Sequence, residues 1–391
     1  MTNTFMGFRR KDGYVGVRNL IAIIPSVFCS AKVAERIAYQ VPGSVFFRHP
    51  VGCSQVGEDL EVTAKTLIAI GKNPNFAGVV VVGLGCERFS PYELADGIAP
   101  TNKMLETVVI QTEGDSLAAI HKGTKVAREM QQMASRQVRE EASVSELMIG
   151  LNCGGSDMTS GLIANPSLGI ASDILVHQGG SSILSEITEL IGTEDILARR
   201  AVNEKVASEI RETIYRTEEK LRRQTQNSSN KERTHLISTG NYAGGLSSVV
   251  EKSLGSMKKS GNAPFSGVIQ YGHQPDKNKK GLFLLDSPGH DGEVSTGQVA
   301  AGAQIILFPT GRGTPTGFPG IPVIKLTGNP KTYIKMKENI DINAGQVLSG
   351  EKSFEQMGNE IYREILEVAS GKQVKAEILG HDEQFCVTRL P

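Results

Sequence analysis

The sequence predicts an α/β protein with two doubly wound domains, each built on a mostly parallel sheet. Apolar runs of strand length alternate with segments of helical periodicity along most of the chain. Several of these strands end in glycine-rich turns, most clearly after Leu151, where Cys153-Gly154-Gly155 separates a strand from a helix. A chain of 391 residues is also too long for one ordinary hydrophobic core. Strands separated by helices indicate right-handed crossovers between parallel strands.

The elements follow one another in the same rhythm through both halves of the chain. In the first half we expect strands at 19–27, 44–48, 78–83, 107–111 and 146–152, and helices at 31–41, 57–71, 99–106, 115–135, 161–177 and 194–223. In the second half we expect strands at 266–271, 281–285, 305–308 and 322–326, and helices at 295–304 and 354–369.

A polar stretch at 217–234 divides the two halves. It contains almost no apolar residues and has Asn227-Ser228-Ser229-Asn230 at its centre, which is typical of a linker. We therefore predict a domain at 1–225 and a second domain at 235–391, which carries the Thr310–Pro315 loop. A solvated loop inside a single domain is the alternative.

The composition excludes several classes of function. Lys and Arg total 42 and so do Asp and Glu, so the net charge gives no reason to expect nucleic acid or an anionic membrane as partner. No apolar run approaches the ~20 residues needed to span a bilayer. The polar N-terminus lacks the apolar core of a signal peptide. We expect a cytoplasmic enzyme.

Three of the five cysteines follow predicted strands. Cys53, Cys86 and Cys153 each stand just after a strand of the first half, so a shared parallel sheet would bring them to one edge. Three thiols suit a borderline metal or an iron–sulfur cluster. The chain has no Cys-x-x-Cys pair, so close backbone packing and substrate contact remain open for these residues. We assign Cys29 and Cys386 to the core.

Two glycine patterns do not support a nucleotide site. The Gly83-x-Gly85 turn lacks the third glycine and the acidic residue of a dinucleotide fingerprint. The Gly311-Arg312-Gly313 turn lacks the Lys-Ser/Thr pair of a phosphate loop. The sequence therefore gives no support for a nicotinamide-dependent oxidoreductase or an ATPase.

Polar residues beside the predicted strand ends suit chemistry on an organic acid. Arg312, between two glycines, suits a bidentate grip on a carboxylate or sulfonate, although an exposed arginine in a turn is the simpler alternative. Together the residue types fit β-elimination from a hydroxy acid. The catalytic candidates are His49, Glu87, Asp157, His290 and Arg312, and the substrate-binding candidates are Gln55, Ser156, Asn165, Gly311, Arg312, Gly313 and Thr314.

Ordered motifs along nearly the whole chain resemble the altronate/galactarate dehydratase family of sugar-acid lyases, in its large subunit or C-terminal portion. The resemblance lies in Asp12-Gly13-x-x-Gly16-Val17-Arg18-Asn19, His49-x-x-Gly52-Cys53-Ser54-Gln55, Gly83-Leu84-Gly85-Cys86-Glu87, Cys153-Gly154-Gly155-Ser156-Asp157, Gly240-Asn241-x-x-Gly244-Gly245, Glu251-Lys252-Ser253-Leu254-Gly255, Pro288-Gly289-x-Asp291, Thr310-Gly311-Arg312-Gly313-Thr314-Pro315 and Asp341-x-Asn343-Ala344-Gly345. The sequence departs from the family pattern at Ile237-Ser238-Thr239-Gly240, where dehydratases have a Pro-Ser-Pro-Gly type of turn.

The resemblance implies an iron(II)-dependent dehydratase that converts a sugar acid to a 2-keto-3-deoxy acid, with manganese(II) or an iron–sulfur cluster as alternative cofactors. It also implies a separate small SAF-domain subunit, because full-length members carry such a domain. We expect Cys53, Cys86 and Cys153 to hold the metal and the enzyme to be an oligomer. Two alternatives are the large subunit of (2R)-sulfolactate sulfo-lyase, which releases sulfite and pyruvate, and a non-catalytic scaffold subunit.

Overall fold

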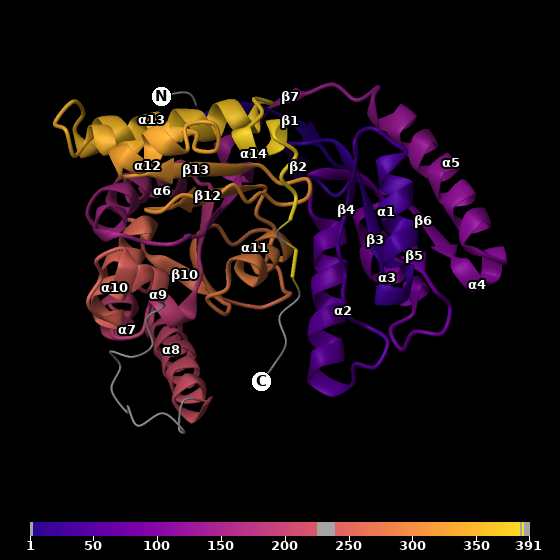
Figure 1. Ribbon diagram of the computed structural model, residues 1–391, viewed down its shortest axis with the longest axis horizontal. Coiled ribbons are helices and arrows are strands. Elements are labelled where there is room, and N and C mark those ends of the chain that lie inside the picture. The colour runs from indigo at the N-terminus through magenta and orange to yellow at the C-terminus, as the bar shows by residue number, and fades with distance from the viewer. Residues whose placement is uncertain (1–2, 225–238, 384, 387–391) are drawn as a thin grey trace.

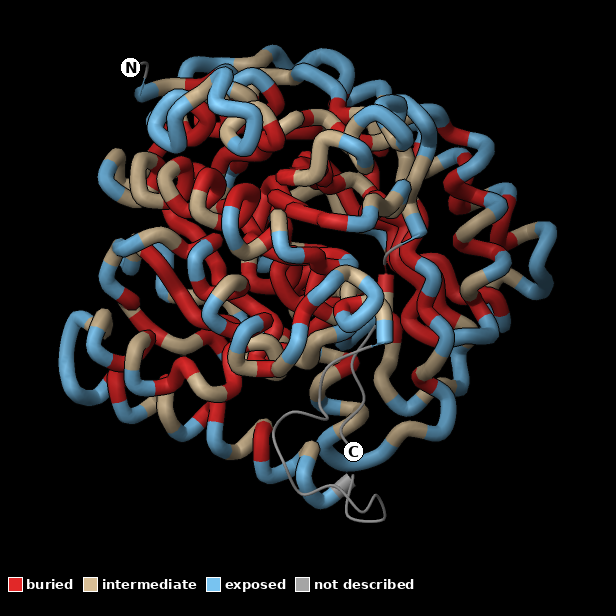
Figure 2. Tube along the Cα trace, turned by 60° about the vertical axis from the view of Figure 1, so that its left-hand side comes forward, coloured by how far each residue is buried: buried red, intermediate tan, exposed pale blue. Residues whose placement is uncertain are grey.

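The computed structural model describes residues 3–224, 239–383 and 385–386, and it confirms the predicted α/β class. Two parallel sheets, each covered by helices, lie side by side, with the N-terminal residues of the chain in a third, antiparallel sheet (Figure 1). The strands are largely red in Figure 2, because their side chains are buried between helical layers.

The smaller parallel sheet has four strands in the order β4-β3-β5-β6. The strands are β3 (Leu20–Pro25), β4 (Ser44–Phe46), β5 (Phe76–Gly83) and β6 (Met104–Val109). They are continuous Val/Ile-rich runs, as expected for strands buried on both faces. One face is covered by α1 (Ala31–Tyr39) and α5 (Ser116–Ala134), and the other by α2 (Gly57–Lys72) and α3 (Pro91–Ile98).

The larger sheet has seven parallel strands in the order β10-β11-β9-β8-β12-β13-β14. They are β8 (Met148–Leu151), β9 (Ser181–Leu184), β10 (Phe265–Gln270), β11 (Gly281–Asp286), β12 (Ile305–Pro309), β13 (Val323–Thr327) and β14 (Ile342–Asn343). The main covering helices are α6 (Asn165–His177), α8 (Glu204–Gln224), α10 (Val249–Ser256), α11 (Asp291–Ala300) and α13 (Phe354–Ala369).

The third sheet was not expected from the sequence. Its order is β2-β1-β7, formed by β1 (Thr4–Arg9), β2 (Val15–Gly16) and β7 (Glu140–Ser143), and both pairings are antiparallel. These strands are short and come from distant parts of the chain, so no local pattern in the sequence marks them. The sheet ties the start of the chain to the segment that joins the two parallel sheets.

Short helices and turns complete the described chain. They are α4 (Ile110–Glu113), α7 (Glu194–Ala198), α9 (Thr239–Ala243), α12 (Pro330–Lys335), α14 (Lys375–Ile378), η1 (Phe28–Ser30), η2 (Ala99–Thr101), η3 (Val144–Glu146), η4 (Ser160–Ala164), η5 (Ile187–Glu189), η7 (Met257–Ser260) and η8 (Ala344–Gln346). The helix expected at 99–106 is wrong, because the α-helix α3 already ends at Ile98, a short η2 turn follows, and β6 begins at Met104.

The sheets divide the chain at a different place from the predicted boundary between 1–225 and 235–391. Strands β8 and β9 precede that boundary, yet they pair with β12 and β11, which follow it. The predicted linker lies partly in α8 and partly at 225–238, outside the described residues. Strand pairing over long distances leaves no local signal, so a polar stretch of sequence between paired strands resembles a linker.

Buried polar side chains and aromatic rings join the two parallel-sheet layers. Asn73 at the end of α2 donates hydrogen bonds to the carbonyl oxygens of Val299 and Ala303, at 3.1 and 2.9 Å. Near the C-terminus, the ring of Phe385 lies 5.3 Å from that of Phe47, which precedes the loop at His49. The C-terminal segment therefore runs between the two layers, as the yellow chain in Figure 1 shows.

Candidate active site

The larger sheet reverses its strand order between β8 and β12, where the carboxyl ends of neighbouring strands open a crevice for a ligand. The turns after the two strands are joined by backbone hydrogen bonds. Gly154 N–H donates to Pro309 at 3.0 Å, and Gly311 N–H donates to Gly155 at 2.9 Å. A Cβ at Gly311 would lie 2.3 Å from the carboxyl carbon of Asp157, so this approach requires glycine.

Three potential ligand or acid–base groups converge at this edge. The Cys153 Sγ follows β8, while the carboxylates of Glu186 and Glu189 follow β9 in the turn that contains η5. One ligand atom from each lies within 4.8 Å of the other two. The Cys153 thiol donates to Glu189 Oε2 at 2.9 Å. We call these three residues the Cys153 cluster.

Two buried lysines neutralise the Cys153 cluster. Lys252, from α10, lies 3.1 Å from Glu189 Oε1 and 3.4 Å from Cys153 Sγ, and it also bonds the hydroxyl of Ser156. Lys259, from η7, forms an ion pair with Glu186 in which both side chains are fully buried. Unpaired buried charges are strongly unfavourable, so these pairings are a condition for burying two carboxylates here.

Glu186 has a backbone conformation that is rare for residues other than glycine. Its φ is +68°, a left-handed conformation that residues other than glycine rarely adopt. Its side chain is fully buried, and Oε1 has no hydrogen-bond partner among the described residues. Such strain and such unpaired polar atoms persist where the surrounding structure imposes them, and they are concentrated at active sites.

Burial and mutual charge push the pKa values of the two carboxylates apart. Burial, with the charge of Glu189, raises the pKa of Glu186 to about 8. Burial also opposes ionisation of Glu189, but Lys252 and Lys259 outweigh it and lower the pKa of Glu189. Glu186 therefore binds a proton more tightly than Glu189 does, although its ion pair with Lys259 opposes this. Such a pair can provide an acid and a base in one site.

Two further titratable groups of the site, Cys153 and Lys252, are held in their protonated forms. Burial and both carboxylates raise the pKa of the Cys153 thiol well above its usual range. Burial alone would lower the pKa of Lys252, but Cys153, Glu189 and Glu186 raise it above the usual lysine value. The lysine is thus a fixed positive charge and the cysteine a neutral thiol.

A second group of side chains adjoins the Cys153 cluster at the start of α11. Burial, assisted by the charge of Glu189, raises the pKa of Asp291 to about 6, while His290 and Lys252 oppose that rise. Asp291 thus interacts with both groups of side chains. Beside it, the ligand atoms of His290, Glu293 and Cys386 lie within 4.8 Å of one another.

Several of the predicted substrate-binding residues lie beside the Cys153 cluster. Ser156 contacts Lys252, as described, and its N–H donates to Asn241 at 3.1 Å. The side chain of Arg312 extends over Gly155 and donates to the carbonyl oxygen of Gly240 at 3.0 Å. Arg312 is exposed, as a residue that meets an incoming anion must be.

Other predicted residues shape the walls of the site. Asn165 donates to the Gly255 carbonyl oxygen at 2.9 Å, which joins α6 to α10. Gly313 has a φ of +86°, and the hydroxyl of Thr314 pairs with that of Thr316 at 2.8 Å within the same loop. These contacts hold the loop after β12 and leave its backbone close to Gly155.

Asp157 has its carboxylate fully engaged in local structure. Its Oδ1 accepts hydrogen bonds from the Thr159 hydroxyl at 2.6 Å and the Ser160 N–H at 3.0 Å, which caps the turn before α6. Its Oδ2 accepts from Asn329 at 2.8 Å. The residue therefore positions the glycine turns and is a poor candidate for proton transfer.

The predicted residues of the smaller sheet are engaged differently. Glu87 accepts from the Ser26 hydroxyl at 2.6 Å and from two backbone N–H groups of its own turn, and these bonds outweigh burial and lower its pKa. Gln55 accepts from Thr63 at 2.9 Å. His49 is 1% exposed, and burial lowers its pKa to about 4 although a contact with the Ser26 backbone opposes that shift.

The expectation that three thiols share one sheet edge is wrong. Cys53 and Cys86 follow β4 and β5 of the smaller sheet and are exposed, whereas Cys153 is buried at the edge of the larger sheet. Within the described chain, neither group of three closely spaced ligand atoms contains Cys53 or Cys86. Cys29 and Cys386 are also not core residues, since Cys29 is exposed and Cys386 partly exposed.

Sequence reasoning missed four charged residues of the site: Glu186, Glu189, Lys252 and Lys259. Glu186 and Glu189 follow a short strand without a glycine turn, and the lysines lie in a polar helical segment that looks solvated. One signal was present, because Lys252 stands inside the Glu251–Gly255 motif that carried the family resemblance. Only the tertiary structure shows that these charges are buried together.

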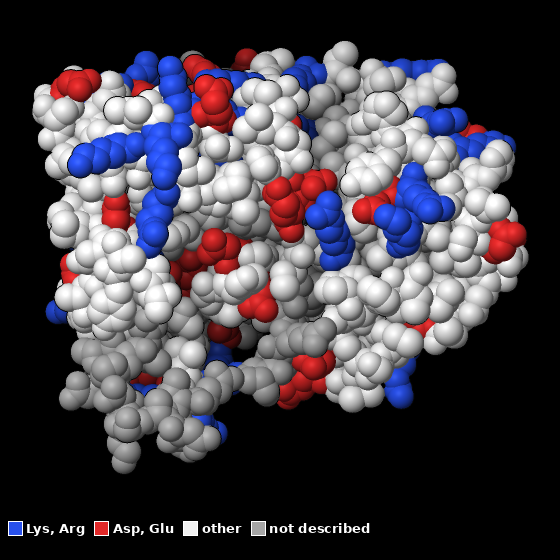
Figure 3. All heavy atoms as spheres, viewed as in Figure 1, with Lys and Arg blue, Asp and Glu red and all other residues white. Residues whose placement is uncertain are grey.

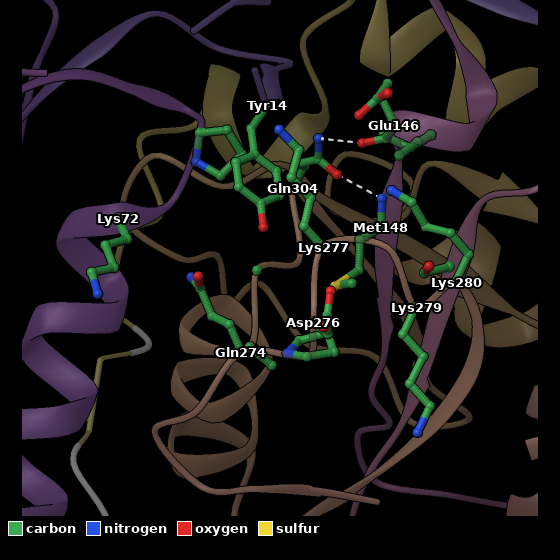
Figure 4. Close-up of a pocket in the computed structure, with 16 residues that line it drawn as sticks. Tyr14, Lys72, Glu146, Met148, Gln274, Asp276, Lys277, Lys279, Lys280 and Gln304 are labelled. Carbon is green, nitrogen blue, oxygen red and sulfur yellow. Dashed lines mark hydrogen bonds between the residues drawn. The ribbon is translucent and has the colours of Figure 1, made fainter. Parts of the chain in front are cut away.

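A separate cavity of about 40 Å³ lies at the opposite, amino ends of the strands (Figure 4). The hydroxyl of Tyr14 and the amide of Gln274 face it, while the Gln304 amide is bonded to Met148 and to Glu146. It lacks the paired buried charges of the Cys153 cluster.

In the half of the molecule that holds the larger sheet, Figure 3 shows acidic side chains recessed in a hollow near α10 and α11, with basic side chains on its rim.

Coupled titratable groups at the switch point of a doubly wound sheet mark a candidate active site of an α/β enzyme. Comparison with known proteins specifies the class. Residues 144–391 match the family described as D-galactarate/altronate dehydratase, C-terminal, and residues 7–135 match D-galactarate dehydratase/altronate hydrolase, second domain. The chain belongs to this family, and it is a lyase.

Individual relatives match nearly all of the chain. Altronate dehydratase of Bacillus subtilis is 38% identical over 96% of this chain and 75% of its own length. The (2R)-sulfolactate sulfo-lyase subunit beta of Chromohalobacter salexigens is 37% identical over 99% of this chain and 97% of its own. Galactarate dehydratase of Escherichia coli is 36% identical over 95% and 73%. No helix in the described part of the chain is long and apolar enough to cross a membrane.

Proposed function

We propose that the protein catalyses β-elimination from a 2-hydroxy acid, with dehydration of a sugar acid as the reaction. The observation that carries the proposal is the pair Glu186 and Glu189, whose pKa values are shifted in opposite directions beside the Lys252 ammonium group. Elimination needs a base, an acid and a positive charge near the developing enolate, and this cluster provides all three.

In the proposed reaction Glu189 removes the proton from C2 of the substrate. Lys252, 3.1 Å from Glu189, stabilises the negative charge that develops on the substrate carboxylate. The electron pair then expels the C3 hydroxyl group, which takes the proton of Glu186 and leaves as water. The resulting enol tautomerises to the 2-keto-3-deoxy acid.

The residues present also fit the iron(II) that the family resemblance implies. As an alternative to the acid–base roles of the two glutamates, Cys153, Glu186 and Glu189 are the residues that would hold it, and the Oε1 atom of the buried Glu186, which has no hydrogen-bond partner among the described residues, supports a ligand at this point. The thiol would lose its proton on binding. When bound, the ion would supply positive charge at the oxygen atoms of the substrate. Manganese(II) and an iron–sulfur cluster are the alternative cofactors that the family resemblance implies.

Arg312 is the proposed anchor for the substrate anion. It extends from the glycine turn after β12 over Gly155, which follows Cys153 by two residues, and donates to the carbonyl oxygen of Gly240. A guanidinium group in this position can bind a carboxylate with two parallel hydrogen bonds. Sugar acids and sulfolactate both carry such an anionic group, so Arg312 serves either substrate.

Release of sulfite from (2R)-sulfolactate is the second candidate. It is supported by the match to the sulfo-lyase subunit beta of Chromohalobacter salexigens, which is 37% identical over 99% of this chain. The same proton abstraction at C2 would then be followed by loss of sulfite instead of water. A small partner subunit, an oligomeric state and a cytoplasmic location remain predictions of the sequence and the family.

One assay separates the two reactions. The purified protein, with iron(II) under anaerobic conditions and with and without a small SAF-domain subunit, is incubated with altronate, galactarate or (2R)-sulfolactate. Keto-deoxy acid formation supports dehydration, and equal amounts of pyruvate and sulfite support the sulfo-lyase. If no substrate reacts with the partner present, the proposed lyase substrates are excluded, and a non-catalytic scaffold becomes the better account.

A further inference from the structure

A second group of metal-binding side chains lies outside the Cys153 cluster, where the C-terminal segment meets the start of α11. One ligand atom each from His290, Glu293 and Cys386 lies within 4.8 Å of the other two. We propose that these residues form a separate site for a zinc-like transition metal ion that fastens the C-terminal segment to the larger sheet.

The two ligands from α11 are placed by helical geometry. His290 stands at the N-cap position of α11 and Glu293 lies three residues later, on the same face of the helix. Residues at this spacing can bind one ion without any change of the backbone. Gly292, between them, has its Cα facing the ring of His290 and the Cβ of Cys386, so that the three side chains meet over a residue without a side chain.

The third ligand is held in place by the packing of the C-terminal segment. The N–H of Cys386 donates to the hydroxyl of Thr296 in α11 at 3.0 Å. The preceding Phe385 is 6% exposed, and its ring lies 5.3 Å from Phe47 and 6.5 Å from Phe318. The thiol therefore faces α11 on an anchored backbone, which lowers the entropy lost when a metal ion binds.

The donor set selects the kind of metal. An imidazole, a carboxylate and a thiolate are ligands of zinc(II), iron(II) and cobalt(II), and they are unsuited to magnesium or calcium. Glu293 and the thiolate of Cys386 carry two negative charges, which balance a divalent ion. His290 is exposed, so water can occupy the fourth position.

The location suggests what the ion does. The C-terminal segment packs against both parallel-sheet layers, through Phe47 in one and Thr296 in the other. A metal ion here would therefore fix the C-terminal segment between the two layers, and its role does not depend on the proposed reaction.

Cobalt(II) titration of the metal-free protein under anaerobic conditions tests the site. Bonds between cobalt and thiolate give a charge-transfer absorption that does not require enzyme activity. The Cys153→Ser background removes the buried thiol of the Cys153 cluster, and in it we expect one equivalent of cobalt with this absorption. Adding Cys386→Ser should abolish the band, and adding His290→Gln should weaken cobalt binding at least tenfold.

The control is Cys29→Ser, which removes an exposed thiol of the smaller sheet layer and should leave the titration unchanged. His290 is exposed, so His290→Gln tests the site without disturbing packing. Absence of the band in Cys153→Ser, or its survival in the Cys386→Ser combination, would overturn the proposal. Both results leave the proposed function untouched, because that function rests on the Cys153 cluster.

Discussion

Both parallel sheets end in glycine turns that carry a cysteine and are accompanied by glutamates, but the two edges use these residues differently. In the smaller sheet, Cys86 is exposed and Glu87 is bonded to Ser26 and to its own turn. In the larger sheet, Cys153 is buried against Glu189 and Lys252. The smaller edge satisfies its carboxylate with neutral donors, whereas the larger edge confines carboxylates and ammonium groups together.

This difference shows that the motif alone does not mark the reactive edge. Neutral hydrogen bonds from a turn fix a carboxylate in its ionised form and give it a structural role. Paired buried charges instead shift the pKa values of neighbouring groups in opposite directions, which is a requirement for acid–base catalysis. We therefore place the chemistry at the larger sheet.

The largest effect is expected from Lys252→Met, which removes the positive charge beside Glu189. We predict a fall in kcat of roughly 10³-fold, as for loss of one strong electrostatic donor. Steady-state kinetics measures it, and thermal unfolding checks the fold, because breaking a buried pair costs about 3–5 kcal/mol. The control is Lys258→Met, which alters the exposed lysine beside Lys259. Equal effects of the two substitutions on kcat would contradict a special role for the buried ammonium group of Lys252.

A change in pH dependence is expected from Glu186→Gln. Since the pKa of Glu186 is raised to about 8, the wild-type protein loses the acid as the pH rises through this value. At pH 9 its kcat/KM should be about tenfold below the plateau. The variant cannot titrate, so it should be slow at every pH and lack this alkaline limb. A limb that persists near pH 8 in the variant would assign it to another group.

A smaller effect, on binding rather than turnover, is expected from Arg312→Lys. The lysine keeps the charge but loses the two parallel hydrogen bonds of a guanidinium group. We predict a rise in KM of about tenfold with kcat nearly unchanged. Arg223→Lys, at an exposed pair on α8, is the matched control and should leave KM at the wild-type value. A fall in kcat without a change in KM would contradict the role of an anchor.

In the smaller sheet layer, we expect His49 to make the free energy of unfolding depend on pH. Burial lowers the pKa of His49 to about 4, below its value of 6.5 in the unfolded chain. Between these values the unfolded chain binds the proton more readily, so the free energy of unfolding decreases as the pH falls. The total loss is roughly 3 kcal/mol. In His49→Gln, denaturant unfolding from pH 7 to 4 should show a shallower loss. An unchanged slope would show that His49 does not titrate in this way.

The sequence supplied the fold class but not the pairing of strands. Continuous apolar runs such as Phe76–Gly83 are strong local signals, and they gave the strands. The position of β8 between β9 and β12 depends on contacts between residues far apart in sequence. For that reason the polar stretch before 235 was mistaken for a domain boundary.

The candidate site was predictable only in part. Cys153, Ser156 and Arg312 stand in glycine turns, where the chain pattern itself points to a ligand site. Glu186 and Lys259 have no such setting, and their fully buried ion pair is a property of the assembled sheet and helices. A lone charge in a sequence is ordinarily solvated, so its burial appears only in the fold.

The most direct test of the central claim compares two glutamates, one from each sheet edge. Glu189→Gln and Glu87→Gln remove one carboxylate charge apiece with little change in volume, and the turnover of both is measured on the substrate found to react. We predict that Glu189→Gln lowers kcat by 10²-fold or more, on the order expected for a lost general base. Glu87→Gln should retain kcat within about threefold while lowering the temperature of unfolding. Loss of turnover in Glu87→Gln, with Glu189→Gln fully active, would place the chemistry at the other sheet and contradict the account.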